Sequence, residues 1–282
     1  MARPTPPNEA VMAPAAVFMF FVLAFAWSWA FWWLAPLWKS DAPVTSSVLA
    51  LLGGFGPSLA AVAVVAHQGG RGGLRRWLSR CLQWRVGWRW MALAFILPFA
   101  FMGLAAAAHV ALGGTLPPSP AAGHILLAAA NFGLVFLVGG PLGEEFGWRG
   151  YALPALQRRW GWRIASLVLG GAWTLWHVPL FYSTGTVQSH LPMGLFALSA
   201  IASSVLFAWL FNRTGGSVLP VLVLHTAVNA WSLVIPVMVR PDGSNLRPFQ
   251  WVVGLLVVVA LLLLFRRDPT PQIGSAAPQT RP

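Results

Sequence analysis

The sequence predicts an all-α polytopic membrane protein, a bundle of about eight transmembrane helices with both termini in the cytoplasm. Its composition is the first observation: 57% of the 282 residues are apolar and only 9% are charged, whereas soluble domains carry about 25% charged residues. The second is a series of apolar runs near the roughly 20 residues that a spanning helix needs. The third is an alternation of basic and neutral connecting segments. Together they exclude a disordered chain and argue against a soluble enzyme.

The apolar runs follow one another along the whole chain. The first is too long and too rich in Trp for a cleaved signal peptide, so we expect it to remain as a spanning helix. The fourth is long and contains Gly and Pro, which blur its ends. The eight runs lie at residues 11–38, 48–67, 90–112, 125–156, 164–181, 193–211, 217–239 and 249–265.

The charges give the orientation of these helices. The chain has 18 basic and 6 acidic residues, a net charge of +12. Arg residues collect in segments 71–89 and 158–163, at Arg213 and after residue 265, while the alternate connections are nearly neutral. Basic segments face the cytoplasm, so we expect a multi-pass protein of the plasma or inner membrane. The positive charge and the neighbouring Trp residues then reflect the lipid bilayer, with no nucleic-acid partner.

The single cysteine, Cys81, excludes a disulfide framework and a cysteine-ligated zinc site. It lies in the basic segment beside Arg80. We therefore expect a surface or interfacial thiol.

Ionisable residues at membrane depth are costly, so each suggests a functional site. Of the six carboxylates, four lie near the ends or in connecting segments, while Glu144 and Glu145 lie within an apolar run. His177 lies in a second run, and His225 with Asn229 in a third. These three clusters are the candidates for chemistry.

Helical spacing separates the two glutamates. Glu145 and Arg149 are four residues apart and share a helix face, where they can neutralise each other in a medium that penalises unpaired charge. Glu144 then faces elsewhere. His225 and Asn229 are also four apart, so both can point into one cavity.

The three clusters are expected at similar depth. Glu144 lies 14 residues before Arg158 and His177 lies 14 residues after Arg163, which places each about 20 Å from the basic connection at 1.5 Å per residue. His225 lies somewhat shallower. This convergence requires the fourth helix to continue past Arg149 towards Leu156.

A carboxylate and a His in an enclosed pocket can activate water for attack on an amide. His225 and Asn229 can donate hydrogen bonds to the oxygen that becomes negative. No Ser–His–Asp or Cys–His set is evident at this depth, and the metalloprotease spacing His-Glu-x-x-His is absent.

Three motifs carry a family resemblance. The sequence Glu-Glu-Phe-Gly-Trp-Arg-Gly-Tyr-Ala-Leu-Pro-Ala-Leu at 144–156 resembles the first motif of the type II CAAX prenyl protease and bacteriocin-processing family, the CPBP or Abi family. Trp173-x-x-x-His177 resembles the second, where Phe is commoner than Trp at the first position, and His225-x-x-x-Asn229 resembles the third. The resemblance covers roughly residues 131–231.

The resemblance implies an intramembrane endopeptidase acting on a membrane-associated peptide or protein, possibly at a prenylated C-terminal tail. By position, Glu144 and His177 would activate water, His225 and Asn229 would stabilise the oxyanion, and Glu145 with Arg149 would support them. We expect no required cofactor, although two His and a Glu could also hold a divalent metal such as zinc.

The expected organisation follows from these assignments. Residues 1–124 would form three helices with the basic loop, and 125–239 the protease-like core of helices four to seven. Residues 240–267 would form helix eight, and 268–282 a disordered tail rich in Pro, Gln, Ala and Ser.

Two other functions remain open at this point. The buried Glu and His could form a proton relay in a proton-coupled carrier, although no inverted repeat is visible. The chain could also be a catalytically silent bacteriocin-immunity or maturation protein, in which His225 and Asn229 only link helices.

Overall fold

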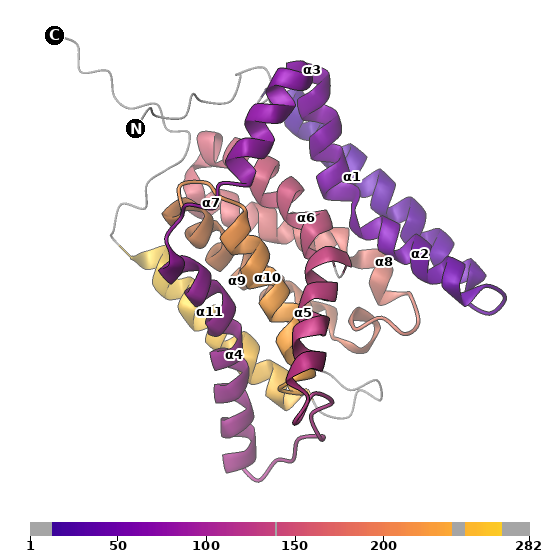
Figure 1. Ribbon diagram of the computed structural model, residues 1–282, viewed down its shortest axis with the longest axis vertical. Coiled ribbons are helices and arrows are strands. Elements are labelled where there is room, and N and C mark those ends of the chain that lie inside the picture. The colour runs from indigo at the N-terminus through magenta and orange to yellow at the C-terminus, as the bar shows by residue number, and fades with distance from the viewer. Residues whose placement is uncertain (1–12, 139, 239–245, 267–282) are drawn as a thin grey trace.

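The computed structural model describes residues 13–138, 140–238 and 246–266, and within these ranges the chain forms helices and connecting loops without a strand (Figure 1). The predicted all-α class is confirmed. The expected disordered tail at 268–282 lies outside the described residues. The α-helices are α1 (Pro14–Leu34), α2 (Pro43–Gly54), α3 (Gly56–Cys81), α4 (Trp88–Ala111), α5 (Ile125–Val138), α6 (Pro141–Gly147), α7 (Leu153–Trp176), α8 (Val178–Phe181), α9 (Met193–Arg213), α10 (Leu219–Ala230) and α11 (Arg247–Phe265).

Shorter helical segments connect several of these helices. A π-helical segment, η3, joins α6 to α7 without a loop, and the others are 3₁₀ turns. Many helices begin with Pro in the first turn, among them Pro14, Pro43, Pro141 and Pro220. Its fixed φ and missing N–H suit that position. The short segments are η2 (Ala35–Trp38), η3 (Trp148–Ala152), η4 (Gln188–His190) and η5 (Trp231–Leu233).

The chain is a multi-pass membrane protein. Among the residues that the structure describes, four helical stretches are long and apolar enough to cross a membrane, and two bent pairs, α2 with α3 and α5 with the α6–α7 stretch, raise the number to as many as six. The seventh predicted run corresponds to the shorter stretch Leu219–Leu233. The predicted number of eight spans and the cytoplasmic termini are therefore not confirmed.

Two glycines break long helices beside the basic segments. Gly70 in α3 (φ 56°) and Gly161 in α7 (φ 71°) adopt left-handed backbone conformations, which glycine tolerates best. The segment after Gly70 is helical to Cys81 rather than the loop that the sequence analysis expects. Cys81 itself is buried, not a surface thiol, because it lies against the glycine-containing face of η3 at Gly150.

The fourth predicted run also divides. It contains α5, α6, η3 and the first residues of α7, and its break lies at Gly140, whose φ is 106°. From Pro141 the backbone is helical through α6 and η3 into α7, as far as the break at Gly161. The required continuation past Arg149 is thus confirmed.

Close glycine contacts fix α6 in the bundle. A Cβ at Gly143 would collide with the backbone of Gly54, and one at Gly147 would collide with the backbone of Pro57. Ser58 Oγ also donates a hydrogen bond to the Leu142 carbonyl at 3.0 Å. This small-xxx-small spacing brings helices into backbone contact in membranes and places both glutamates beside the α2–α3 junction.

The remaining helices enclose α6 and α7. In Figure 1, α1 and α3 lie on one side of the bundle and α4 and α11 on the other, and each pair is in contact. Helix α9 packs along α7 and α11, and α10 packs against α4, α5 and α6. Large side chains fill the shared interior, including Phe20, Trp148, Trp176 and Phe207.

Candidate active site

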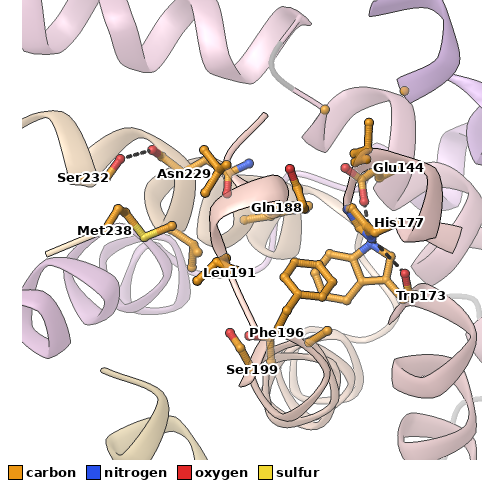
Figure 2. A pocket seen from close by; sticks show the side chains of 18 of the residues that line it. Glu144, Trp173, His177, Gln188, Leu191, Phe196, Ser199, Asn229, Ser232 and Met238 are labelled. Carbon is orange, nitrogen blue, oxygen red and sulfur yellow. Dashed lines mark hydrogen bonds between the residues drawn. The ribbon is translucent and has the colours of Figure 1, made fainter. Parts of the chain in front are cut away.

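An interior cavity of about 460 Å³ lies between α6, α7, α9, α10 and α11 (Figure 2). Most of its lining is apolar, which lowers the local dielectric and strengthens the electrostatic interactions within it. Its polar lining residues are Glu144, His177, Gln188, Ser199, Ser203, His225, Asn229 and Ser232. All four residues predicted to do chemistry are in this set.

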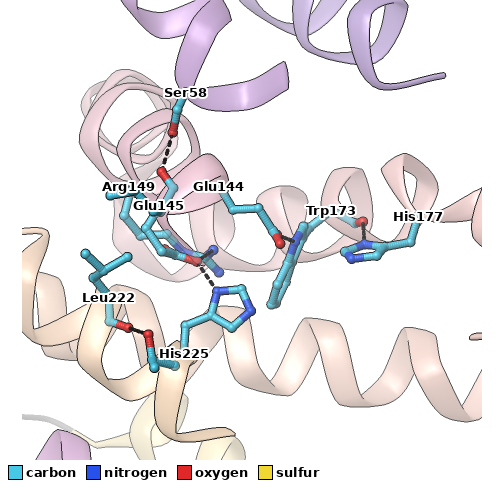
Figure 3. Close-up of polar contacts among 10 residues, drawn as sticks. Ser58, Glu144, Glu145, Arg149, Trp173, His177, Leu222 and His225 are labelled. Carbon is cyan, nitrogen blue, oxygen red and sulfur yellow. Dashed lines mark hydrogen bonds and ion pairs between the residues drawn. The ribbon is translucent and has the colours of Figure 1, made fainter. Parts of the chain in front are cut away.

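Glu144 reaches the cavity from the first turns of α6. Only 5% of the residue is exposed. The indole Nε1–H of Trp173 donates a hydrogen bond to its Oε2 at 2.6 Å (Figure 3). A hydrogen bond to a carboxylate is roughly twice as strong as a neutral one, so this contact fixes the orientation of Glu144.

His177 lies at the junction of α7 and α8, at the end of a helix and not inside it. Its Nδ1 is 2.8 Å from the backbone carbonyl of Trp173. Because a carbonyl only accepts, Nδ1 carries the hydrogen, and Nε2 of the neutral ring is left as a proton acceptor. Trp173 thus contacts Glu144 with its side chain and His177 with its backbone (Figure 3).

Glu145 forms a separate buried cluster. Its Oε1 accepts hydrogen bonds from Arg149 at 2.9 Å and from His225 Nδ1 at 2.7 Å, and Glu145 and Arg149 are both 0% exposed. The predicted ion pair is present. The helical spacing does not predict the bond from His225 to Glu145, which the structure shows (Figure 3).

Arg149 is held on two sides by aromatic rings. Its guanidinium carbon lies 4.7 Å from the ring centroids of Trp173 and of Phe207. Such contacts stabilise a cation that has left water. They join the Glu145 cluster to the residue that holds Glu144.

Asn229 completes the polar lining from α10, one turn beyond His225. Figure 2 places it across the cavity from Glu144 and His177, and its carbonyl accepts a hydrogen bond from Ser232 Oγ at 2.8 Å. The carboxylate and one His therefore face the cavity from α6 and α7, while the other His and the amide face it from α10.

Zinc binding, the alternative that the sequence leaves open, would need several ligand side chains placed around one point of the cavity. Within residues 13–138, 140–238 and 246–266, no group of three His, Cys, Asp or Glu side chains is placed to hold a metal ion. The Nδ1 atoms of His177 and His225 are both engaged by protein acceptors.

Sequence reasoning missed two kinds of residue at this site. It gives Trp173 no role, although the indole N–H, which Phe lacks, is a signal that the sequence contains. It also missed the polar residues Gln188, Ser199 and Ser203, whose positions depend on how α9 and η4 pack around the cavity. No local pattern marks these three.

Comparison with known proteins agrees with the motifs. Residues 126–231 match the family model described as type II CAAX prenyl endopeptidase Rce1-like. The chain is also 32% identical over 111 residues to a protein named CAAX prenyl protease 2 from Methanococcus maripaludis, an alignment that covers 37% of this chain and 37% of that protein. The matched segment contains every motif residue that lines the cavity. In this central segment the chain is therefore similar to type II CAAX prenyl endopeptidases, and it spans well under half the length of the curated relative it matches.

Proposed function

We propose that this protein is an intramembrane endopeptidase that hydrolyses a peptide bond of a membrane-associated protein or peptide. The observation that carries the proposal is that Glu144, His177, His225 and Asn229 line one apolar cavity inside a membrane bundle. A carboxylate and an imidazole on one side, with hydrogen-bond donors on the other, are the groups that water-dependent amide hydrolysis needs.

In the first step, water in the cavity attacks the scissile carbonyl carbon. Glu144 and the free Nε2 of His177 accept the proton that the water loses, while the carbonyl electrons move onto oxygen. Trp173 holds the Glu144 carboxylate and the tautomer of His177 at this point. The product is a tetrahedral intermediate with one negative oxygen.

His225 and Asn229 stabilise that oxygen. The Asn229 amide donates directly. His225 donates from Nε2 when its ring is doubly protonated, because Nδ1–H is already committed to Glu145. The Glu145 carboxylate holds the His225 ring through its Nδ1, which gives the second glutamate a role away from the reacting atoms.

Collapse of the intermediate breaks the carbon–nitrogen bond. The amine leaves with the proton that Glu144 and His177 took from water, so one water molecule and one peptide bond give one carboxyl and one amine group. No covalent enzyme intermediate is needed.

The substrate class follows from the setting of the site. An apolar cavity within helices suits a peptide segment delivered from the bilayer. The name of the Methanococcus maripaludis relative makes a prenylated C-terminal tail the first substrate to test, and the plasma membrane is the proposed location.

The test is cleavage by purified protein in detergent, with a quenched peptide library that includes prenylated and unprenylated tails. We expect cleavage by the wild type and none above background by Glu144→Gln or His177→Ala. Reactions with and without a chelator address metal dependence. Cleavage that survives Glu144→Gln would contradict the mechanism, and ion-dependent uptake into liposomes without any cleavage would favour a carrier.

A further inference from the structure

Trp173 contacts four charged or titratable residues at or beside the cavity, namely Glu144, His177, Arg149 and His225. It lies in the last turn of α7 and is 7% exposed. Its indole N–H bonds to Glu144, its carbonyl bonds to His177, and its ring stacks against the guanidinium of Arg149. Its ring also meets His225 edge-on at 5.4 Å between centroids.

The indole N–H decides which oxygen of Glu144 is free. An indole nitrogen only donates, so Oε2 is the acceptor and Oε1 is the remaining oxygen. Oε1 lies over Gly140, where a Cβ would come within 2.8 Å of it. The carboxylate is therefore held by the donor at Oε2, while the missing side chain at Gly140 leaves room for Oε1.

The Trp173 side chain links Glu144 to Glu145 through its contact with Arg149. Arg149 contacts the rings of both Trp173 and Phe207 and donates to Glu145. The continuous series Glu145, Arg149, Trp173, Glu144 joins the buried ion pair to the carboxylate at the cavity. Contacts of this kind restrict the orientations of the side chains that they join.

We propose that Trp173 is a positioning residue for the water-activating pair, acting through its indole N–H on Glu144. This inference rests on the proposed function. It goes beyond that function because it assigns a role to a residue that does not touch the reacting atoms. In this protein the orientation of the Glu144 carboxylate depends on the indole N–H donor of Trp173.

The kinetic test uses Trp173→Phe, which keeps an aromatic ring and removes the donor. We expect kcat to fall roughly tenfold to hundredfold, the value of one hydrogen bond to a charged group, with KM little changed. The acid limb of the kcat/KM profile moves to higher pH, because the N–H stabilises the carboxylate form. A loss of packing alone would not move that limb.

The matched control is Trp176→Phe. Trp176 lines the same cavity on the same turn of helix, but its Nε1 has no hydrogen-bond partner within the described part of the chain. We expect its pH profile to match the wild type. Equal shifts in the two variants, or none in Trp173→Phe, would overturn the proposal.

A second readout does not depend on activity. In ¹⁵N-labelled protein, the indole N–H resonance of Trp173, assigned by its loss in Trp173→Phe, moves upfield in Glu144→Ala while that of Trp176 stays in place. An unmoved Trp173 resonance would overturn the proposal whether or not the protein cleaves peptides. A moved resonance in a protein without peptidase activity would overturn the proposed function and leave the Glu144 contact established.

Discussion

At the scale of single residues, two adjacent glutamates have different surroundings. Glu144 faces the cavity with one hydrogen bond from Trp173, and Glu145 is enclosed by Arg149 and His225. Their side chains diverge because neighbouring residues of a helix point about 100° apart. Glu144 is therefore available for chemistry, whereas the charge of Glu145 is compensated by Arg149.

Arg149 gives the first prediction at this scale. Arg149→Met keeps much of the packing but leaves the Glu145 carboxylate without its cation, which we expect to lower the free energy of unfolding by about 3–5 kcal/mol. Thermal unfolding in detergent measures the change. The double variant Arg149→Met with Glu145→Gln removes both charges and is expected to recover part of the loss. A double variant no more stable than Arg149→Met would contradict this account of the pair.

Most of the candidate site at this scale could be predicted from the sequence. Spacing alone pairs Glu145 with Arg149, and the three motifs bring Glu144, His177, His225 and Asn229 to one cavity. The bond from His225 to Glu145 could not be predicted, because it depends on the rotation of α10 against α6. The burial of Cys81 depends likewise on contacts between helices.

At the scale of elements, the position of α6 decides where Glu144 lies. Gly143 and Gly147 let α6 approach the backbone of the α2–α3 junction, and Gly140 permits the sharp turn that precedes it. Gly147, in the first motif, is therefore required for the close packing of α6 against Pro57. A side chain there must push the helix, and the carboxylate with it, out of place.

Gly147→Ala tests this packing. We expect a loss of about 1–3 kcal/mol in stability, typical of overpacking, and a fall in kcat measured on the fraction that remains folded. Gly171→Ala on α7 is the control, because its Cβ would meet nothing within 4 Å. The control is expected to be as stable as the wild type or slightly more so. Equal behaviour of the two variants would exclude close packing as the role of Gly147.

The sequence predicts the helical elements better than their breaks. It correctly extends the fourth helix past Arg149, which keeps Glu144 buried. It does not locate the turn at Gly140 or the end of α7 at Trp176, and it expects a loop where α3 continues after Gly70. An apolar run shows that a segment can be helical, but backbone contacts decide where it bends.

At the scale of the whole molecule, charge asymmetry predicts the orientation in the membrane. The arginines of segment 71–89 are expected in the cytoplasm and the neutral connection between α4 and α5 on the opposite side. The number of spans and the division at residues 124, 239 and 267 remain predictions. The composition of a short, bent helix does not show whether its bend lies inside the bilayer.

Cysteine labelling in membrane vesicles tests this orientation. Ser79 and Thr115 are both exposed, and Cys81, the native cysteine, is buried. A membrane-impermeant thiol reagent should modify Ser79→Cys only in inside-out vesicles and Thr115→Cys only in right-side-out vesicles. The wild type provides the background. The reverse pattern would contradict the assignment of the basic segments to the cytoplasm.

The central claim is that Glu144 activates the attacking water, and the turnover number of Glu144→Gln tests it most directly. The variant keeps the size of the side chain and an oxygen that can accept from Trp173, but it cannot take a proton. We predict that kcat on any peptide that the wild type cleaves falls by about 10²–10⁴, the usual contribution of a general base, at unchanged thermal stability. A folded Glu144→Gln protein with the turnover number of the wild type would contradict the claim.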